Sequence, residues 1–189
     1  MKLLQNKLFL FFILSSFLFL IPFCIRVFFV DIPEIQIEDN TVKRNNVVTK
    51  ITEFLDMDDH KSVFLLIFKN NLKGCLVNIF GGIMLGLGTL MNLIYNGFFS
   101  ADVFKSSFDA GLSLSEILKV TLPHSFELIG FWLSGAIGFY IAWHLLQLMR
   151  GKESLPKGFY KTVGTGAALV FVIIFVAAYV EAYISVNQL

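Results

Sequence analysis

The chain is poor in charge and in cysteine. Only 15% of its 189 residues are charged, and the formal net charge is +1. Binding along a nucleic acid requires clustered lysine and arginine side chains, so this composition argues against a nucleic-acid partner. The two cysteines, Cys24 and Cys75, lie in separate apolar runs. They provide neither a disulfide framework nor the ligand spacing of a metal site, and we interpret both as buried thiols.

Apolar residues dominate the composition. Hydrophobic residues make up 56% of the chain, 22 residues are phenylalanine, and the mean hydropathy is +0.74. This balance lies far from that of a soluble globular domain. We therefore predict an all-α integral membrane protein, a bundle of about four transmembrane helices, or five, with short amphipathic helices at the interface.

The apolar runs divide the chain into three parts. Residues 1–30 contain an apolar run longer than the core of a secretory signal, without a small-residue cleavage site, and we interpret it as an uncleaved transmembrane anchor. The rival interpretation is a cleaved signal, which leaves three spans. Residues 31–61 are rich in Asp and Glu and predict a water-facing acidic loop. Residues 62–189 predict a membrane domain with three spans, at about residues 72–98, 123–149 and 164–186.

Three segments between the spans have the pattern of short helices. Residues 47–55 and 60–68 place apolar side chains at helical spacing, as interfacial segments do. Ser113 and Glu116 form a capping-box pattern that opens another short helix, and Pro123 ends it or begins the next span.

The basic residues give conflicting signals about orientation. Lys and Arg in the first and third loops favour a cytoplasmic location for these loops, whereas the basic N-terminus favours the opposite arrangement. Either a fifth, partly re-entrant crossing exists around residues 81–104, or one of the signals is weak.

Glycine is concentrated in the predicted second and third spans. Small residues allow helices to approach closely in a membrane, and Gly82 and Gly86 have the G-x-x-x-G spacing. A kink or a re-entrant break is the rival interpretation of the same residues. The predicted helix-packing residues are Gly81, Gly82, Gly86, Gly135 and Gly138.

Polar residues inside the spans form the candidate site. An up-and-down arrangement places the end of span two, the start of span three and the end of span four on one side of the membrane. A buried carboxylate costs about 2.5–3.5 kcal/mol and needs a partner. The cluster is either an interhelical hydrogen-bond network, or an ion relay or docking pocket. Its predicted members are Asn92, Asn96, His124, Glu127 and Glu181.

This cluster falls short of a catalytic or metal site. One histidine and two carboxylates, without a second histidine or an activated Ser or Cys, complete neither chemistry. We therefore predict no enzyme activity, no metal and no cofactor. A second polar group is expected near the other membrane surface, formed by Arg26, Asn70, Asn71 and His144.

Four segments carry a family resemblance. They are Phe68-Lys-Asn-Asn71, Asn96-Gly97, Leu122-Pro-His-Ser-Phe-Glu127 and Ala177-Ala-Tyr-Val-Glu-Ala182. In this order they resemble the stage II sporulation protein M family of bacterial membrane proteins over residues 64–186. The third segment departs from the family pattern, because Ser125 stands where glycine is usual and the histidine and glutamate are three residues apart.

The resemblance implies a multi-pass scaffold in the bacterial cytoplasmic membrane. Its expected surroundings are the lipid bilayer and other membrane proteins, either cell-wall remodelling proteins or the ATPase and permease of an ABC transporter. Small members of the family suggest the alternative of an accessory subunit in export or in maturation of a circular bacteriocin. A transporter with an intramembrane carboxylate relay is the second alternative. Gly-rich faces are also compatible with homo-oligomers.

Overall fold

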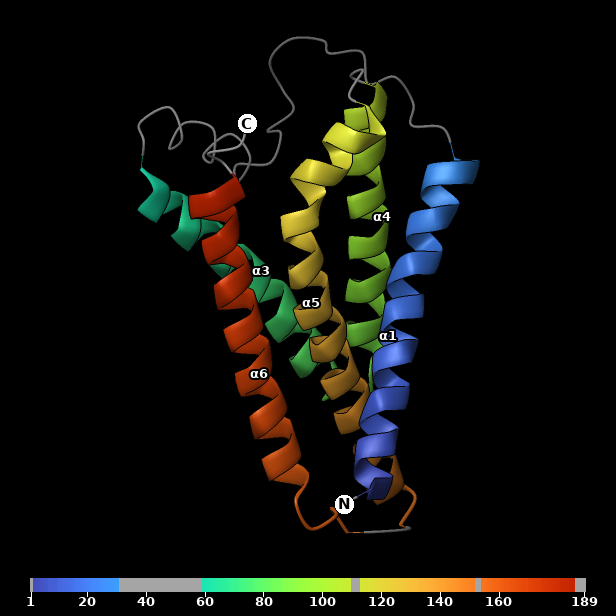
Figure 1. Cartoon of the computed structure of the whole chain (residues 1–189). Coiled ribbons are helices and arrows are strands. Elements are labelled where there is room, and N and C mark those ends of the chain that lie inside the picture. Colours follow the sequence, from blue (N-terminus) through green and yellow to red (C-terminus); the bar gives the residue numbers. More distant parts are fainter. Residues whose placement is uncertain (1, 31–58, 110–112, 152–153, 186–189) are drawn as a thin grey trace, which may run out of the picture.

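A computed structural model of the chain describes residues 2–30, 59–109, 113–151 and 154–185. These residues form a helical bundle, as predicted (Figure 1). A short π-helix, η1 (Glu181–Ser185), continues the last α-helix. The α-helices are α1 (Lys2–Phe29), α3 (His60–Gly81), α4 (Leu87–Asp109), α5 (Leu114–Met149) and α6 (Phe159–Val180).

The prediction of four membrane spans is confirmed. Helices long and apolar enough to cross a membrane cover Lys7–Phe29, His60–Gly81, Phe126–Met149 and Phe159–Tyr183. The α5 span is 61% buried, whereas the other three are 17–22% buried. Helix α5 is therefore the centre of the bundle, and the other spans expose apolar side chains, as lipid-facing helices do.

The predicted single span at residues 72–98 is wrong, because the chain reverses direction within it. Helix α3 ends at Gly81, residues 82–86 form a turn, and α4 runs back through the bundle (Figure 1). Leu85 and Gly86 have φ angles of 54° and 85°, which a continuing right-handed helix does not allow. The glycine-rich segment is thus a break in the helix, as the rival interpretation proposed. Helix α4 provides the additional passage expected around residues 81–104.

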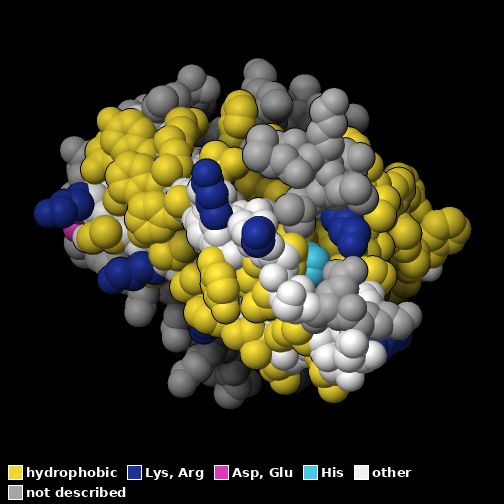
Figure 2. Space-filling view, turned by 90° about the horizontal axis from the view of Figure 1, so that it is seen from below, with side chains coloured by type: hydrophobic (Ala, Val, Ile, Leu, Met, Phe, Trp, Pro, Cys, Tyr) yellow, Lys and Arg dark blue, Asp and Glu magenta, His cyan; other side chains and the backbone are white. Residues whose placement is uncertain are grey.

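This hairpin removes the conflict over orientation between the basic N-terminus and the basic connection that precedes the last span. With the added passage, the N-terminus and the connection between α5 and α6 lie at the same end of the bundle, called here the lower end (Figure 1). Seen from this end, Lys and Arg side chains are spread among hydrophobic ones (Figure 2). The ends of α1 and α6 and the start of α3 lie at the opposite, upper end.

The predicted boundaries near the third span are also corrected. Helix α5 runs without a break from residue 114 through Pro123, so the expected separate short helix is its first part. A proline inside a helix removes one helical hydrogen bond and either kinks or ends the helix, and at Pro123 the helix continues. Residues 60–68 likewise belong to α3, and the segment 47–55 lies outside the described residues.

The first helix packs as an integral part of the bundle. A Cβ atom on Gly97 of α4 would collide with the carbonyl oxygen of Phe19 in α1. The Phe19 ring meets the rings of Phe131 and Trp132 edge-on. These contacts place α1 against α4 and α5 within the bundle. Its Cys24 is exposed rather than buried, because it faces away from α4 and α5.

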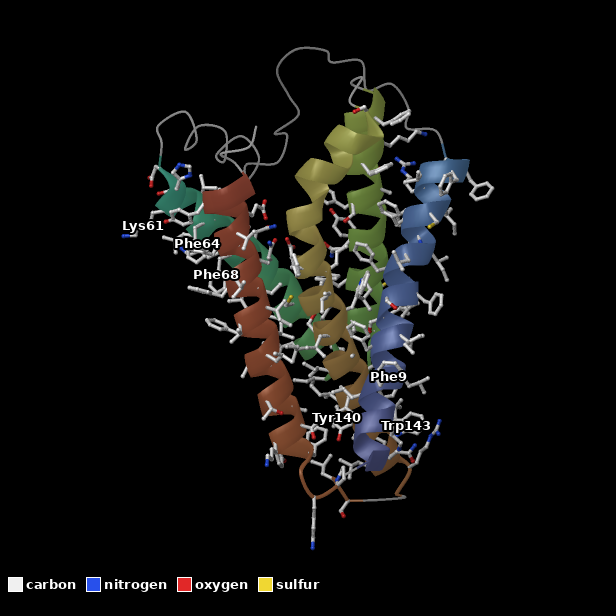
Figure 3. The ribbon with its side chains drawn as sticks, in the orientation of Figure 1. Phe9, Lys61, Phe64, Phe68, Tyr140 and Trp143 are labelled. Atoms are coloured by element: carbon white, nitrogen blue, oxygen red, sulfur yellow. The ribbon has the colours of Figure 1, made fainter. Side chains whose placement is uncertain are left out.

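An aromatic seam joins α3 to α6. The Phe64 ring lies 5.2 Å from that of Phe175, and the Phe68 ring lies 5.4 Å from that of Phe171. Figure 3 shows Phe64 and Phe68 on α3 beside α6. Ring contacts of this edge-on kind add to the van der Waals packing that drives helix association in lipid.

Candidate functional site

A chain of buried and half-buried amide side chains links α4, α3 and α5. Nδ2 of Asn96 donates to Oδ1 of Asn92 over 3.0 Å, and Nδ2 of Asn92 donates to Oδ1 of Asn78 over 2.8 Å. Nδ2 of Asn78 then donates to Oγ of Ser134 over 2.9 Å. The Ser134 hydroxyl donates in turn to the carbonyl oxygen of Phe131. Every donor therefore points in the same direction, from α4 through α3 into α5.

Further bonds fix Asn78 at the centre of this amide chain. Asn78 is fully buried, and its side chain also donates to the Phe131 carbonyl. The buried hydroxyl of Thr89 donates to the Asn78 carbonyl over 2.7 Å. Since an unsatisfied polar group inside a membrane is costly, these bonds favour one arrangement of α3, α4 and α5.

Glycines make this arrangement possible by removing side chains where backbones meet. A Cβ atom on Gly138 would collide with the Asn78 carbonyl oxygen, and one on Gly82 with the Gly138 carbonyl oxygen. The structure places all five predicted packing glycines at contacts between elements. Gly81 lies against Gly88 and Thr89, Gly82 against Gly138, Gly86 against Phe139 and Ala142, Gly135 against Ser15 and Leu93, and Gly138 against Asn78 and Thr89.

A small polar cavity lies beside Asn96, at one end of the amide chain. Its volume is about 80 Å³. This is room for water but far below the several hundred Å³ of a site for an organic ligand. Its polar lining residues come from α3, α4 and α5. They are Asn70, Asn71, Asn96, Ser100 and Glu127.

The cavity brings together part of the predicted cluster. Asn96 and Glu127 line it, and Asn92 bonds to Asn96. Glu181 is the first residue of η1 and is not among the lining residues. His124 lies in α5 one turn before Glu127, and its side chain is outside the described residues.

The predicted group of Arg26, Asn70, Asn71 and His144 near one membrane surface does not form. Asn70 and Asn71 lie within α3 and line the cavity beside Glu127. Nε of Arg26 pairs with Asp102 of α4 over 2.6 Å. His144 packs on the rings of Tyr140 and Phe159. The expectation assumed one continuous span at residues 72–98. The hairpin changes which side chains lie at the same depth along the bundle.

Asn78 and Thr89 are the important residues missing from the predicted site. Asn78 is a single amide in the apolar run from Cys75 to Phe80. The spacing of Thr89, Asn92 and Asn96 places three polar side chains on one side of a helix. This spacing could have revealed the face of α4 to which Asn78 bonds.

A second polar junction ties the start of α3 to the end of α6. Nδ1 of His60 lies 2.9 Å from the carbonyl oxygen of Ala182, and its ring lies against that of Tyr183. Asp59 caps α3 by accepting from the backbone N–H of Ser62. Hydrogen bonding by Ser62 lowers the pKa of the Asp59 carboxyl, since it stabilises the charged form.

These features define a multi-pass helical membrane protein with a polar, glycine-packed interior. The chain belongs to the stage II sporulation protein M family, whose match covers residues 8–186. An uncharacterised protein of Methanocaldococcus jannaschii is 31% identical over 129 residues, which cover 65% of this chain and 70% of that protein. No solved structure matches the chain. The family match includes α1, and so extends beyond the residues that carried the resemblance.

Proposed function

We propose that the chain is a non-enzymatic subunit that holds other membrane proteins in a complex of the cell envelope. The observation that carries this proposal is the use of the interior polar side chains. Asn78, Asn92 and Ser134 form hydrogen bonds between helices, and outside the interior the partly exposed pair of Arg26 and Asp102 joins α1 to α4. Such residues hold a shape, and a fixed shape is what a scaffold offers to its partners.

The outer faces of the bundle are the surfaces available to partner helices. Phe17 of α1, Met91 of α4 and Val172 of α6 are each more than half exposed. Partners of two classes fit the family, cell-wall remodelling proteins and the subunits of an ABC transporter. The membrane is the bacterial cytoplasmic membrane in this proposal, or its archaeal counterpart, since the M. jannaschii relative is archaeal.

We also propose that the lower end of the bundle faces the cytoplasm. The charged residues whose side chains are described there, Lys7, Arg150, Lys157 and Lys161, are all basic, whereas the upper end carries both signs, with Asp59 and Asp102 beside Arg26 and Lys61. Basic residues that flank short connections remain on the cytoplasmic side. The basic residues of the loop at 31–61 oppose this orientation, but they stand among many acidic ones. Reporter fusions at the α5–α6 connection test it, and a periplasmic or external reading would reverse the assignment.

The scaffold proposal is tested by photo-crosslinking in native membranes. A photo-reactive residue is placed at Phe17, Met91 or Val172 in separate variants, with the buried Ala136 as the control position. We expect at least one outward face to crosslink a defined protein in stoichiometric amount, identified by mass spectrometry. Recovery of an ABC ATPase or permease would favour the transport-linked alternative over a cell-wall scaffold. Crosslinks to lipid alone at all three faces would contradict the proposal.

The polar cavity supports one alternative, a transporter with a carboxylate relay. Glu127 lies beside three asparagines within the membrane domain, where a carboxylate is expensive and commonly functional. In this alternative Glu127→Gln abolishes transport while the crosslinked partner is still recovered. A scaffold retains both its partner and its cellular activity in the Glu127→Gln and Glu181→Gln variants.

A further inference from the structure

The outer face of α3 carries two lysines at one end of an apolar groove. Lys69 and Lys73 are four residues apart, so both side chains lie on the same side of the helix. The groove continues past Leu76 and Phe80 to Met84 in the turn. Its volume is about 430 Å³, several times that of the polar cavity, which places it in the size range of a site for an organic molecule.

The position of the two lysines within the helix is unusual. They lie about 14 and 20 Å from the start of a helix about 33 Å long. Both are exposed, and within the described part of the chain neither ammonium group makes a hydrogen bond or an ion pair. A cation this far along a membrane helix normally has a counter-charge or reaches the interface. Among the residues that the structure describes, none supplies a counter-charge to Lys69 or Lys73, so an anion from the surroundings would be favoured beside them.

The groove has the polarity of a lipid molecule. Helix α3 descends from the upper end of the bundle, so Lys69 and Lys73 lie nearer that membrane surface than Phe80 and Met84 do. A phosphate at the lysines would therefore direct an acyl chain along the apolar part of the groove, away from the upper membrane surface. Basic sites beside transmembrane helices bind anionic headgroups in this way.

We propose that this groove binds one anionic phospholipid of the surrounding bilayer. The phosphate is held between the ammonium groups of Lys69 and Lys73. One acyl chain lies against Leu76, Val77, Phe80 and Met84. The proposal does not depend on the scaffold role, since it concerns the lipid contact of α3 alone.

The test is native mass spectrometry of the delipidated full chain, titrated with phosphatidylglycerol and with phosphatidylcholine. Each lysine near an anionic headgroup contributes about 1 kcal/mol, so the pair should give about 30-fold tighter binding of phosphatidylglycerol. Lys69→Gln with Lys73→Gln should remove this preference. Lys157→Gln with Lys161→Gln, a basic pair at the lower end and outside the groove, is the matched control and should leave it unchanged.

A second variant separates the groove from the charge. Leu76→Trp fills the groove without changing a lysine, and its exposed position makes misfolding a small risk. It should weaken binding of phosphatidylglycerol at least tenfold. Equal binding of both lipids by the wild-type chain, or an equal loss in both lysine pairs, would overturn the proposal. So would unchanged binding in Leu76→Trp, or binding of inorganic phosphate as tight as that of phosphatidylglycerol.

Discussion

Replacing Gly138 by alanine should destabilise the bundle far more than the same change at Gly164. A Cβ atom on Gly138 would collide with the Asn78 carbonyl oxygen and lie 3.0 Å from the Thr89 methyl carbon. Relief requires α3 and α4 to move away from α5, which strains the bond from Asn78 to Ser134. Overpacking of this kind costs about 1–3 kcal/mol.

Gly164 is the matched control because a Cβ atom there has no neighbour within 4 Å. In a helix, alanine is favoured over glycine by about 0.5–1 kcal/mol, so Gly164→Ala should be neutral or stabilising. Gly138 also lies inside a helix, so the gain in helix propensity is common to both variants, and they should differ by the overpacking cost of about 1–3 kcal/mol in free energy of unfolding. The measurement is unfolding in detergent in a Cys24→Ser background, followed by reaction of the buried Cys75 with a thiol reagent. Equal stabilities of the two variants would refute the close contact between α3 and α5.

Three other predictions follow from the polar contacts. The Asn78→Leu variant loses the bonds from Asn78 to Asn92 and to α5. Each such bond contributes about 0.6 kcal/mol in a membrane, so the substitution should lower the free energy of unfolding by about 1–2 kcal/mol. An unchanged free energy of unfolding would contradict a structural role for the amide chain. A double-mutant cycle with Arg26→Gln and Asp102→Asn should give a coupling of about 0.5–1 kcal/mol in the free energy of unfolding. This coupling should fall with added salt because the pair is partly exposed. A coupling near zero would argue against the ion pair. The pKa of Asp59 is lowered in the fold, so its cap contributes above the unfolded pKa and is lost as pH falls through the lower folded value. The protection of the first turn of α3 against hydrogen exchange, corrected for the intrinsic exchange rate at each pH, should therefore fall at acid pH in the wild type but not in Asp59→Asn.

The sequence predicted well those spans whose apolar run is bounded at each end by charged residues or glycine. Helices α1 and α6 are long, uniformly apolar and weakly buried, so composition alone locates them. The hairpin escaped prediction because hydropathy is high on both sides of residues 82–86. The reversal depends on two left-handed residues, Leu85 and Gly86, and nothing in the apolar pattern distinguishes this break from a close-packing face.

Errors in the candidate site follow from that one missed reversal. Asn70 and Asn71 were expected across the membrane from Glu127, yet they line the same cavity, because α3 descends past the level at which α5 carries Glu127. The sequence could predict that Asn92 and Asn96 belong to the polar cluster, since polar residues in an apolar span require partners. The identity of their partner, Asn78, depends on α3 and α4 being adjacent, which only the tertiary structure provides.

The hairpin and the amide chain depend on each other. Helix α4 is not among the helices apolar enough to span a membrane by themselves, partly because Thr89, Asn92 and Asn96 occupy one of its faces. Those residues make α4 unfavourable in lipid until α3 provides acceptors at Asn78 and Gly74. The tight turn at residues 82–86 presents these acceptors as soon as α4 folds back. A polar helix can thus be held among apolar ones, and Asn78, which bonds to α4, also ties α3 to α5 through its bond to Ser134.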